Sequence, residues 1–179
     1  DRYLKEKNIN SENLEIDKKK YFLDLYSVLI KIKASYNLEI IFCEHPKIDY
    51  ENNPYYKKFK EDFIIKKNQT NEYIKHAKIV VFTGGSSMVN QAIIYQKKII
   101  YLTSKLIGEY NNNLIYSFLN VIDLKAVELN ESYEIDKDKL EFELVEKKKN
   151  YNKYINENLI VEKNISSKEQ IKKVLYSKI

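Results

Sequence analysis

Short apolar runs alternate along this chain with longer segments whose apolar residues recur at helical spacing. The apolar runs lie at 38–43, 63–65, 78–82, 98–102 and, more weakly, 121–124. The helical patterns lie at 18–36, 54–60, 71–77, 87–96 and 111–119. Strands that are apolar on both faces and are separated by helices are typical of a buried parallel sheet. We therefore predict one α/β domain over residues 1–179, with a Rossmann-like parallel sheet and helices on both of its faces.

Local signals mark where several of the helices should begin. Pro54 suits the first turn of the second predicted helix. Backbone N–H groups in the first turn have no acceptor within the helix, so a proline there removes no hydrogen bond. Thr70 is the predicted N-cap of the third helix. Towards the end of the sequence, a long charged helix is predicted over 138–158. Ser166 and Glu169 then form a capping box for a last helix.

The composition excludes several classes of protein. Hydrophobic residues make up 44% of the chain, which is too much for a disordered protein. Cys43 is the single cysteine, so no disulfide can form within the chain, and a reducing compartment fits best. No apolar run approaches the roughly 18 residues of a membrane span, and no signal-peptide pattern opens the sequence. We expect a cytoplasmic protein that needs neither a metal nor a cofactor.

The net charge of +5 does not by itself predict a nucleic-acid partner. Arg2 is the only arginine, whereas readout of bases and bidentate phosphate contacts rely heavily on arginine. The lysines are interspersed with acidic residues, so we expect no nucleic-acid binding. The lysine-rich helix at 17–33 leaves two interpretations open. It is either a solvated helix face or a peripheral contact with the inner face of the cell membrane.

Two of the three glycines stand side by side, in a chain that otherwise avoids glycine. Gly84 and Gly85 follow the apolar run 78–82, and Ser86 and Ser87 come directly after them. A glycine pair lets the backbone turn sharply, and the serines then lie at a helix N-terminus, where free N–H groups favour an anion. The pattern predicts a phosphate-binding loop. The alternative is a tight strand-to-helix connection with a serine N-cap.

A histidine and a proline follow the first apolar run. Because ligands of α/β sheets bind beyond the carboxyl ends of the strands, we expect His45 and Pro46 on the same rim as the Gly84–Ser87 loop. An imidazole can donate a hydrogen bond to a phosphate or, when protonated, pair with its charge. The alternative is a turn with a surface histidine. His76, at the end of a short predicted helix, is expected to be structural.

Taken in order, these motifs resemble those of a known family. The quoted stretches are IFCEHPK (41–47), VVFTGGSS (80–87), NQA (90–92) and KIIYLT (98–103). From Ile41 to Leu106 the chain resembles the C-terminal, donor-binding half of bacterial GT-B glycosyltransferases. The closest likeness is to surface-carbohydrate enzymes and to sialyltransferases with HP and SS motifs. Residues 151–155 resemble the closing helices of that group. Lys98 replaces a usual proline, and Lys47 replaces a frequent arginine.

The resemblance implies a function and a set of site residues. The domain would bind a nucleotide-sugar donor, CMP-sialic-acid-like by preference, for the synthesis of surface polysaccharide or lipooligosaccharide. His45 would be catalytic, contacting the donor phosphate and helping the nucleotide depart without a metal ion. The resemblance implies substrate contacts by His45, Pro46, Gly84, Gly85, Ser86 and Ser87. The glycan acceptor would bind to an N-terminal domain that these residues lack, so the chain alone is expected to be inactive.

Two other functions stay open beside this one. A related transferase would move glycerol phosphate or ribitol phosphate from a CDP-activated donor with the same histidine and serine loops. A non-catalytic Rossmann-like binding module would keep the fold without the chemistry. The Asp136–Asp138 triplet resembles a metal-binding DxD motif, but it opens a charged helix and is interpreted as helix capping.

Overall fold

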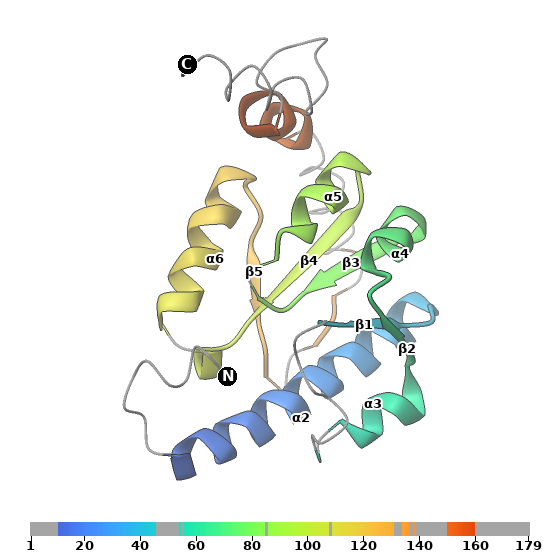
Figure 1. The fold of residues 1–179 in the computed structure, drawn as a ribbon, viewed down its shortest axis with the longest axis vertical. Helices are drawn as coiled ribbons and strands as arrows, with labels where there is room; N and C mark the ends of the chain where they lie inside the picture. Colours follow the sequence, from blue (N-terminus) through green and yellow to red (C-terminus); the bar gives the residue numbers. More distant parts are fainter. Residues whose placement is uncertain are drawn as a thin grey trace, which may run out of the picture.

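Parallel strands alternate with helices in the computed structural model (Figure 1), which describes residues 11–45, 54, 56–84, 86–107, 109–130, 134–136, 138 and 150–159. In chain order the elements are α2 (Ser11–Tyr36), β1 (Ile41–Glu44), α3 (Lys57–Asp62), β2 (Ile64–Lys67), α4 (Thr70–His76), β3 (Ile79–Phe82), α5 (Met88–Ile94), β4 (Lys98–Thr103), η1 (Lys105–Ile107), α6 (Glu109–Val121), β5 (Ala126–Glu128) and η2 (Ile155–Leu159). Every pairing between the described strands is parallel. The predicted α/β class is therefore confirmed.

The described strands form two sheets, one of β1 and β2 and one in the order β3-β4-β5. The sequence predicted a single sheet, so this division is a difference from the expectation. Phe42 of β1, Ile65 of β2 and Val81 of β3 nevertheless pack against the same hydrophobic cluster. In the described part of the chain, a shared hydrophobic core thus joins the two sheets, in place of one continuous ladder of hydrogen bonds.

Strand β4 lies between two core clusters. Ile100 and Leu102 belong to the cluster under α2, and Ile99 and Tyr101 belong to the cluster under α5 and α6, as the alternation of side chains along a strand requires. The buried residues of the first cluster, here called the α2 core, are Leu25, Val28, Leu29, Ile32, Tyr56, Phe59, Phe63, Ile100, Leu102 and Leu129. Those of the second, the α6 core, are Ile74, Phe82, Val89, Ala92, Ile93, Ile99, Tyr101, Ile115, Leu119, Ile122, Leu124, Tyr151 and Tyr154.

Helix α2 confirms the amphipathic pattern predicted at 18–36 and begins earlier, at Ser11. Its apolar stripe is at most 5% exposed and consists of Leu25, Val28, Leu29 and Ile32. Because these side chains are buried in the α2 core, any contact of this helix with another surface would use the opposite, lysine-bearing face. Among the described helices, none is long and apolar enough to cross a membrane.

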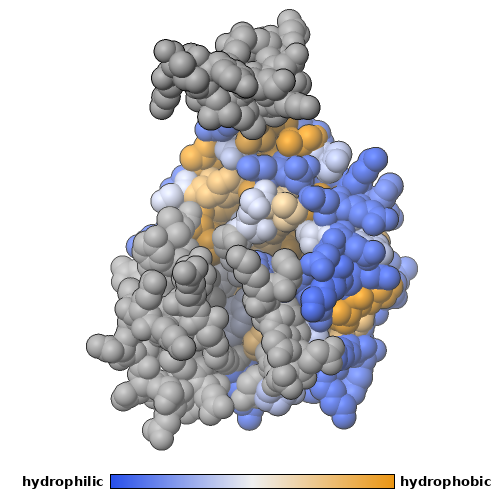
Figure 2. Space-filling view, viewed as in Figure 1, coloured by the Kyte–Doolittle hydropathy of each residue, from blue (hydrophilic) through white to orange (hydrophobic). Residues whose placement is uncertain are grey.

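The β1–β2 sheet is less fully covered on the face away from α2. Ile41 and Ile64 pair in register and remain 39% and 45% exposed. In the space-filling view, an apolar patch lies at the right, where Figure 1 places β2, with hydrophilic surface above and below it (Figure 2). The expected helical cover of both sheet faces therefore holds better for β3, β4 and β5 than for this pair of strands.

The weak strand predicted at 121–124 is wrong. Helix α6 continues to Val121, and the chain then turns, with Asp123 at a φ of 52°. The Leu124 N–H donates to the Leu119 carbonyl at 2.9 Å, which closes the end of the helix. Ile122 and Leu124 are buried in the α6 core. The apolar residues of this run are thus buried at the end of a helix, and strand β5 begins after them.

Two of the predicted helix starts also differ from the structure. Pro54 lies in a turn, and α3 begins three residues later, at Lys57. Thr70 is the first residue of α4 instead of its N-cap, and Gln69 stands at the N-cap position without a side-chain cap bond.

The helix predicted over 138–158 is helical at its end, where residues 150–154 continue into η2. Tyr154 donates from its hydroxyl to Asn90 Oδ1 at 3.0 Å, and Phe118 lies edge-on to the Tyr154 ring. These contacts attach the segment to α5 and α6. Most of the predicted helix and the capping box of Ser166 and Glu169 lie outside the described residues.

Candidate functional site

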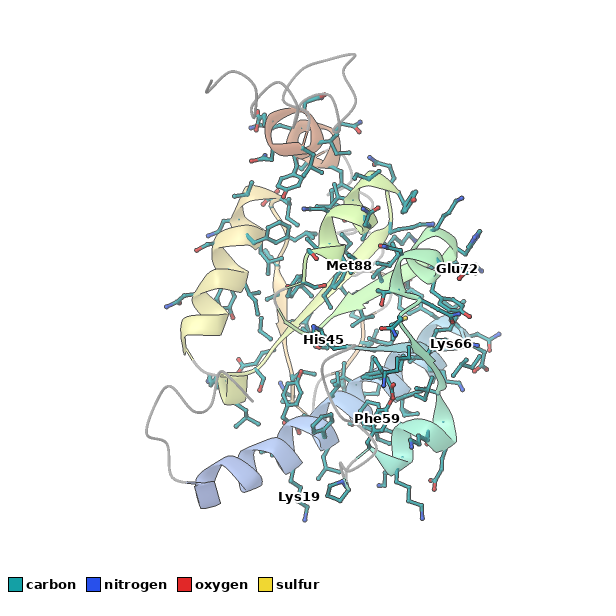
Figure 3. All side chains as sticks on the ribbon, in the orientation of Figure 1. Lys19, His45, Phe59, Lys66, Glu72 and Met88 are labelled. Carbon is teal, nitrogen blue, oxygen red and sulfur yellow. The ribbon has the colours of Figure 1, made fainter. Side chains whose placement is uncertain are left out.

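The predicted site residues lie where strands end. His45 follows β1 directly and is exposed, and the Gly84–Ser87 loop follows β3. In the view of Figure 3, His45 lies on the side of the molecule towards which β3 and β4 run and end. This is the edge at which α/β sheets bind ligands. Pro46 and Gly85, the other two predicted contacts, lie outside the described residues.

Gly84 is half-buried, and nothing in the described part of the chain requires a glycine there. A Cβ built on Gly84 would meet no heavy atom of the described residues within 4 Å, and its φ lies outside the left-handed range that favours glycine. The sharp turn was predicted for the glycine pair, and its second member, Gly85, lies outside the described residues. The space beside Gly84 is open, so another molecule could approach its backbone.

The two serines differ in their local roles. Ser86 Oγ accepts a hydrogen bond from the Met88 N–H at 3.2 Å and so closes a small turn. Ser87 precedes α5 but makes no side-chain cap bond. Both side chains are exposed, so both hydroxyls are free to turn and donate a hydrogen bond to a ligand. Because α5 has only 7 residues, against ten predicted, the chemistry of the loop depends on these hydroxyls and on its backbone.

Two tyrosines that the sequence did not single out hold the start of this loop. The Tyr21 hydroxyl, from α2, donates to the Thr83 carbonyl at 3.4 Å. The Tyr101 hydroxyl, from β4, donates to the Gly84 carbonyl. Burial raises the pKa of Tyr101 to about 12, so its hydroxyl stays protonated and donates throughout the neutral pH range. No sequence signal connects Tyr21 to a loop 62 residues further on.

A buried carboxylate ends β1, next to His45. Glu44 is 9% exposed, and its Oε1 accepts a hydrogen bond of 2.8 Å from the Tyr56 hydroxyl. Tyr56 is itself 1% exposed. The sequence carried a signal for Glu44, namely a charged residue that closes an otherwise apolar run, but the motif that was recognised there began with His45.

Removal of the Tyr56 hydroxyl should destabilise the protein. In Tyr56→Phe the Glu44 carboxylate loses this donor while it stays buried, which costs about 1–3 kcal/mol in the free energy of unfolding. The measurement is urea denaturation followed by circular dichroism. The double variant Tyr56→Phe/Glu44→Leu, which removes both partners, should recover part of the loss. Equal stability of Tyr56→Phe and the wild type would contradict this role.

The end of β4 adds two buried polar side chains to the same edge. Thr103 is 2% exposed, and its Oγ1 has no hydrogen-bond partner among the described residues. Ser104 is 3% exposed, and its Oγ accepts a bond from the Leu106 N–H at 3.2 Å. Continuing the β3–β4 register beyond Phe82 and Tyr101 places Thr103 opposite Gly84. Polar groups therefore gather on both strands next to the loop.

An open hollow of about 350 Å³ lies elsewhere on the molecule. It is lined by Ile30, Lys33, Ala34, Asn37, Leu38 and Glu39, between the end of α2 and the start of β1. The Lys33–Glu39 ion pair of 3.0 Å crosses it. Because it precedes β1, it is at the amino ends of the strands and does not belong to the predicted site.

Comparison of the chain with models of protein families, with curated proteins and with solved structures gave no match.

Proposed function

We propose that this chain is the donor-binding domain of a metal-independent glycosyltransferase, and that it holds a nucleotide sugar at the carboxyl ends of β1 and β3. The observation that carries the proposal is the open space beside Gly84. Neither crowding nor backbone conformation accounts for a glycine at this position, whereas a phosphate that approaches the backbone would. The order of the HP, GGSS and NQA motifs supports the same assignment.

The proposed chemistry assigns a role to His45, which follows β1, and to the two serines, which follow β3. The His45 imidazole would donate a hydrogen bond to the donor phosphate and stabilise its charge as the nucleotide departs. The Ser86 and Ser87 hydroxyls, both exposed beside Gly84, would donate to the same phosphate. We propose that this chain contributes donor binding to the reaction. The donor is CMP-sialic-acid-like, and the reaction belongs to bacterial surface-carbohydrate synthesis.

Gly84→Ala is the sharpest test of this proposal. A methyl group at this position has free space in the protein, so the stability should stay within about 1 kcal/mol of the wild type. The same methyl group would occupy the space of the ligand, so the affinity for the nucleotide should fall at least about tenfold. Calorimetric titration with CMP, CDP, UDP, GDP and ADP measures the affinity, and urea denaturation measures the stability. Unchanged affinity of a binding-competent variant would contradict the assignment of Gly84.

Side-chain variants test the proposed hydrogen-bond donors to the phosphate. His45→Ala and the double variant Ser86→Ala/Ser87→Ala should each lose about 1.5–3 kcal/mol of binding free energy, or roughly 10- to 150-fold in Kd. His76→Ala and Ser117→Ala, at exposed positions on α4 and α6, are the matched controls and should bind like the wild type. Preference for CDP over CMP would favour transfer of a polyol phosphate. If the folded wild type bound none of the five nucleotides, the proposal would be wrong.

A further inference from the structure

The start of the loop is held from both faces of the sheet. Tyr21 packs at the edge of the α2 core, and Tyr101 is a buried member of the α6 core. Their hydroxyls donate to consecutive carbonyls, those of Thr83 and Gly84. The two carbonyls are thus bonded towards opposite sides of the strand layer. Two donors from different elements, on opposite faces, fix both peptide groups more firmly than either donor could alone.

The rings that carry these hydroxyls are themselves held in place. Tyr101 is 3% exposed, and its ring stacks on Phe82 at a centroid distance of 5.8 Å. The Tyr21 ring lies edge-on to Phe22, with the centroids 5.6 Å apart. Tyr101 is buried and Tyr21 partly buried, and aromatic rings packed in such contacts have few alternative rotamers. The hydroxyls therefore keep their direction towards the loop without further cost in conformational entropy when a ligand binds.

Fixing a carbonyl also fixes the N–H group of the next residue. A peptide group is planar and trans, so its C=O and N–H point in opposite directions. When the Thr83 carbonyl accepts the bond from Tyr21, the Gly84 N–H is turned away from the Tyr21 side. This N–H belongs to the residue beside which the structure leaves open space. Tyr21 thus orients the Gly84 N–H, and Tyr101 holds the carbonyl of the same residue.

We infer that Tyr21 and Tyr101 are positioning residues of the donor site, which orient the Thr83–Gly84 backbone to bind the phosphate of the nucleotide. The inference rests on the proposed function and deepens it, because it assigns preorganisation of the loop to two side chains that need not contact the ligand. Tyr101 should have the larger effect, since its ring is the more deeply buried of the two.

The test removes only the hydroxyl groups. Tyr101→Phe should weaken CMP binding about 3- to 10-fold, and Tyr21→Phe should weaken it less, because each variant loses a neutral hydrogen bond that orders the loop. Tyr116→Phe, at an exposed tyrosine on α6, is the matched control and should bind CMP like the wild type. Cytidine, which has no phosphate, is a second ligand whose weak binding can be followed by NMR. All of these variants should bind cytidine with the same affinity. A general loss of structure would instead weaken the binding of both cytidine and CMP.

Hydrogen exchange measures the ordering of the loop separately from nucleotide binding. In Tyr101→Phe, amide exchange in the segment 83–90 should become about 3- to 10-fold faster, while exchange in α2 and α6 stays as in the wild type. Wild-type affinity for CMP in Tyr101→Phe would overturn the inference and leave the proposed function intact. If the wild type binds no nucleotide, the proposed function fails, and with it the role in binding. The exchange result then still decides whether the tyrosines order the loop, and unchanged exchange overturns that as well.

Discussion

Phe59→Ala should remove about 3–5 kcal/mol from the free energy of unfolding, a large part of what a domain of this size possesses. Phe59 is 0% exposed and is the centre of the aromatic cluster between α2, α3 and β1. Its ring centroid lies 5.2–6.0 Å from those of five other rings, namely Phe22, Tyr26, Phe42, Tyr56 and Phe63. Truncation would leave a cavity that five rigid rings cannot fill by small movements.

Urea denaturation measures this loss, with Tyr116→Ala as the control. Tyr116 is 46% exposed on α6, so its truncation should change the stability by no more than about 0.5 kcal/mol. If Phe59→Ala does not fold, Phe59→Leu keeps the prediction testable, with an expected loss of about 1–2 kcal/mol. A stability of Phe59→Ala within about 1 kcal/mol of the wild type would show that this cluster is not a tightly packed core.

Leu102→Ala should cost about 2–5 kcal/mol, because Leu102 is 0% exposed on the strand that separates the two core clusters. β4 pairs with both β3 and β5, and its other face supports the α6 core through Ile99 and Tyr101. A cavity on one side of β4 should therefore weaken both clusters together. The urea midpoint should fall while its slope stays unchanged, as in one cooperative transition.

Ile64→Ala is the matched control, because it truncates an exposed aliphatic side chain on a strand. Ile64 lies on β2 and is 45% exposed, so its truncation should cost less than about 1 kcal/mol. Circular dichroism and tyrosine fluorescence should give the same midpoint in Leu102→Ala. Two separate transitions would show that the α2 core and the α6 core unfold independently, against the packing of β4 between them.

How far the fold could be predicted depended on how local its determinants are. The stripe on α2 and the solid apolar pattern of β4 were predicted correctly, because periodicity along a few turns or pleats decides which side chains can be buried. The run at 121–124 was misread as a strand. An apolar stretch of this length buries equally well as a helix end, and the hydrogen bond from Leu124 to Leu119 selected the helix.

The candidate site could likewise be predicted only where local sequence patterns decide its structure. The placement of His45 and of the Gly84–Ser87 loop at strand ends followed from the order of strands and helices, and the structure agrees with it. Glu44, Thr103 and the two tyrosines were missed, since their importance comes from burial and from hydrogen bonds to residues distant in sequence. The open space beside Gly84 could not be predicted either, because only the folded chain shows whether a Cβ has room.

The sequence by itself determined the α/β class, the parallel strands and the placement of His45 and of the Gly84–Ser87 loop after strand ends. These features depend on hydrophobic periodicity and on connectivity, which are properties of neighbouring residues. Only the tertiary structure decided that the strands divide into two sheets on a shared core, and that Tyr21 and Tyr101 orient the loop. Those features depend on side chains that meet across 17 to 62 residues of chain, and no local pattern encodes such a meeting.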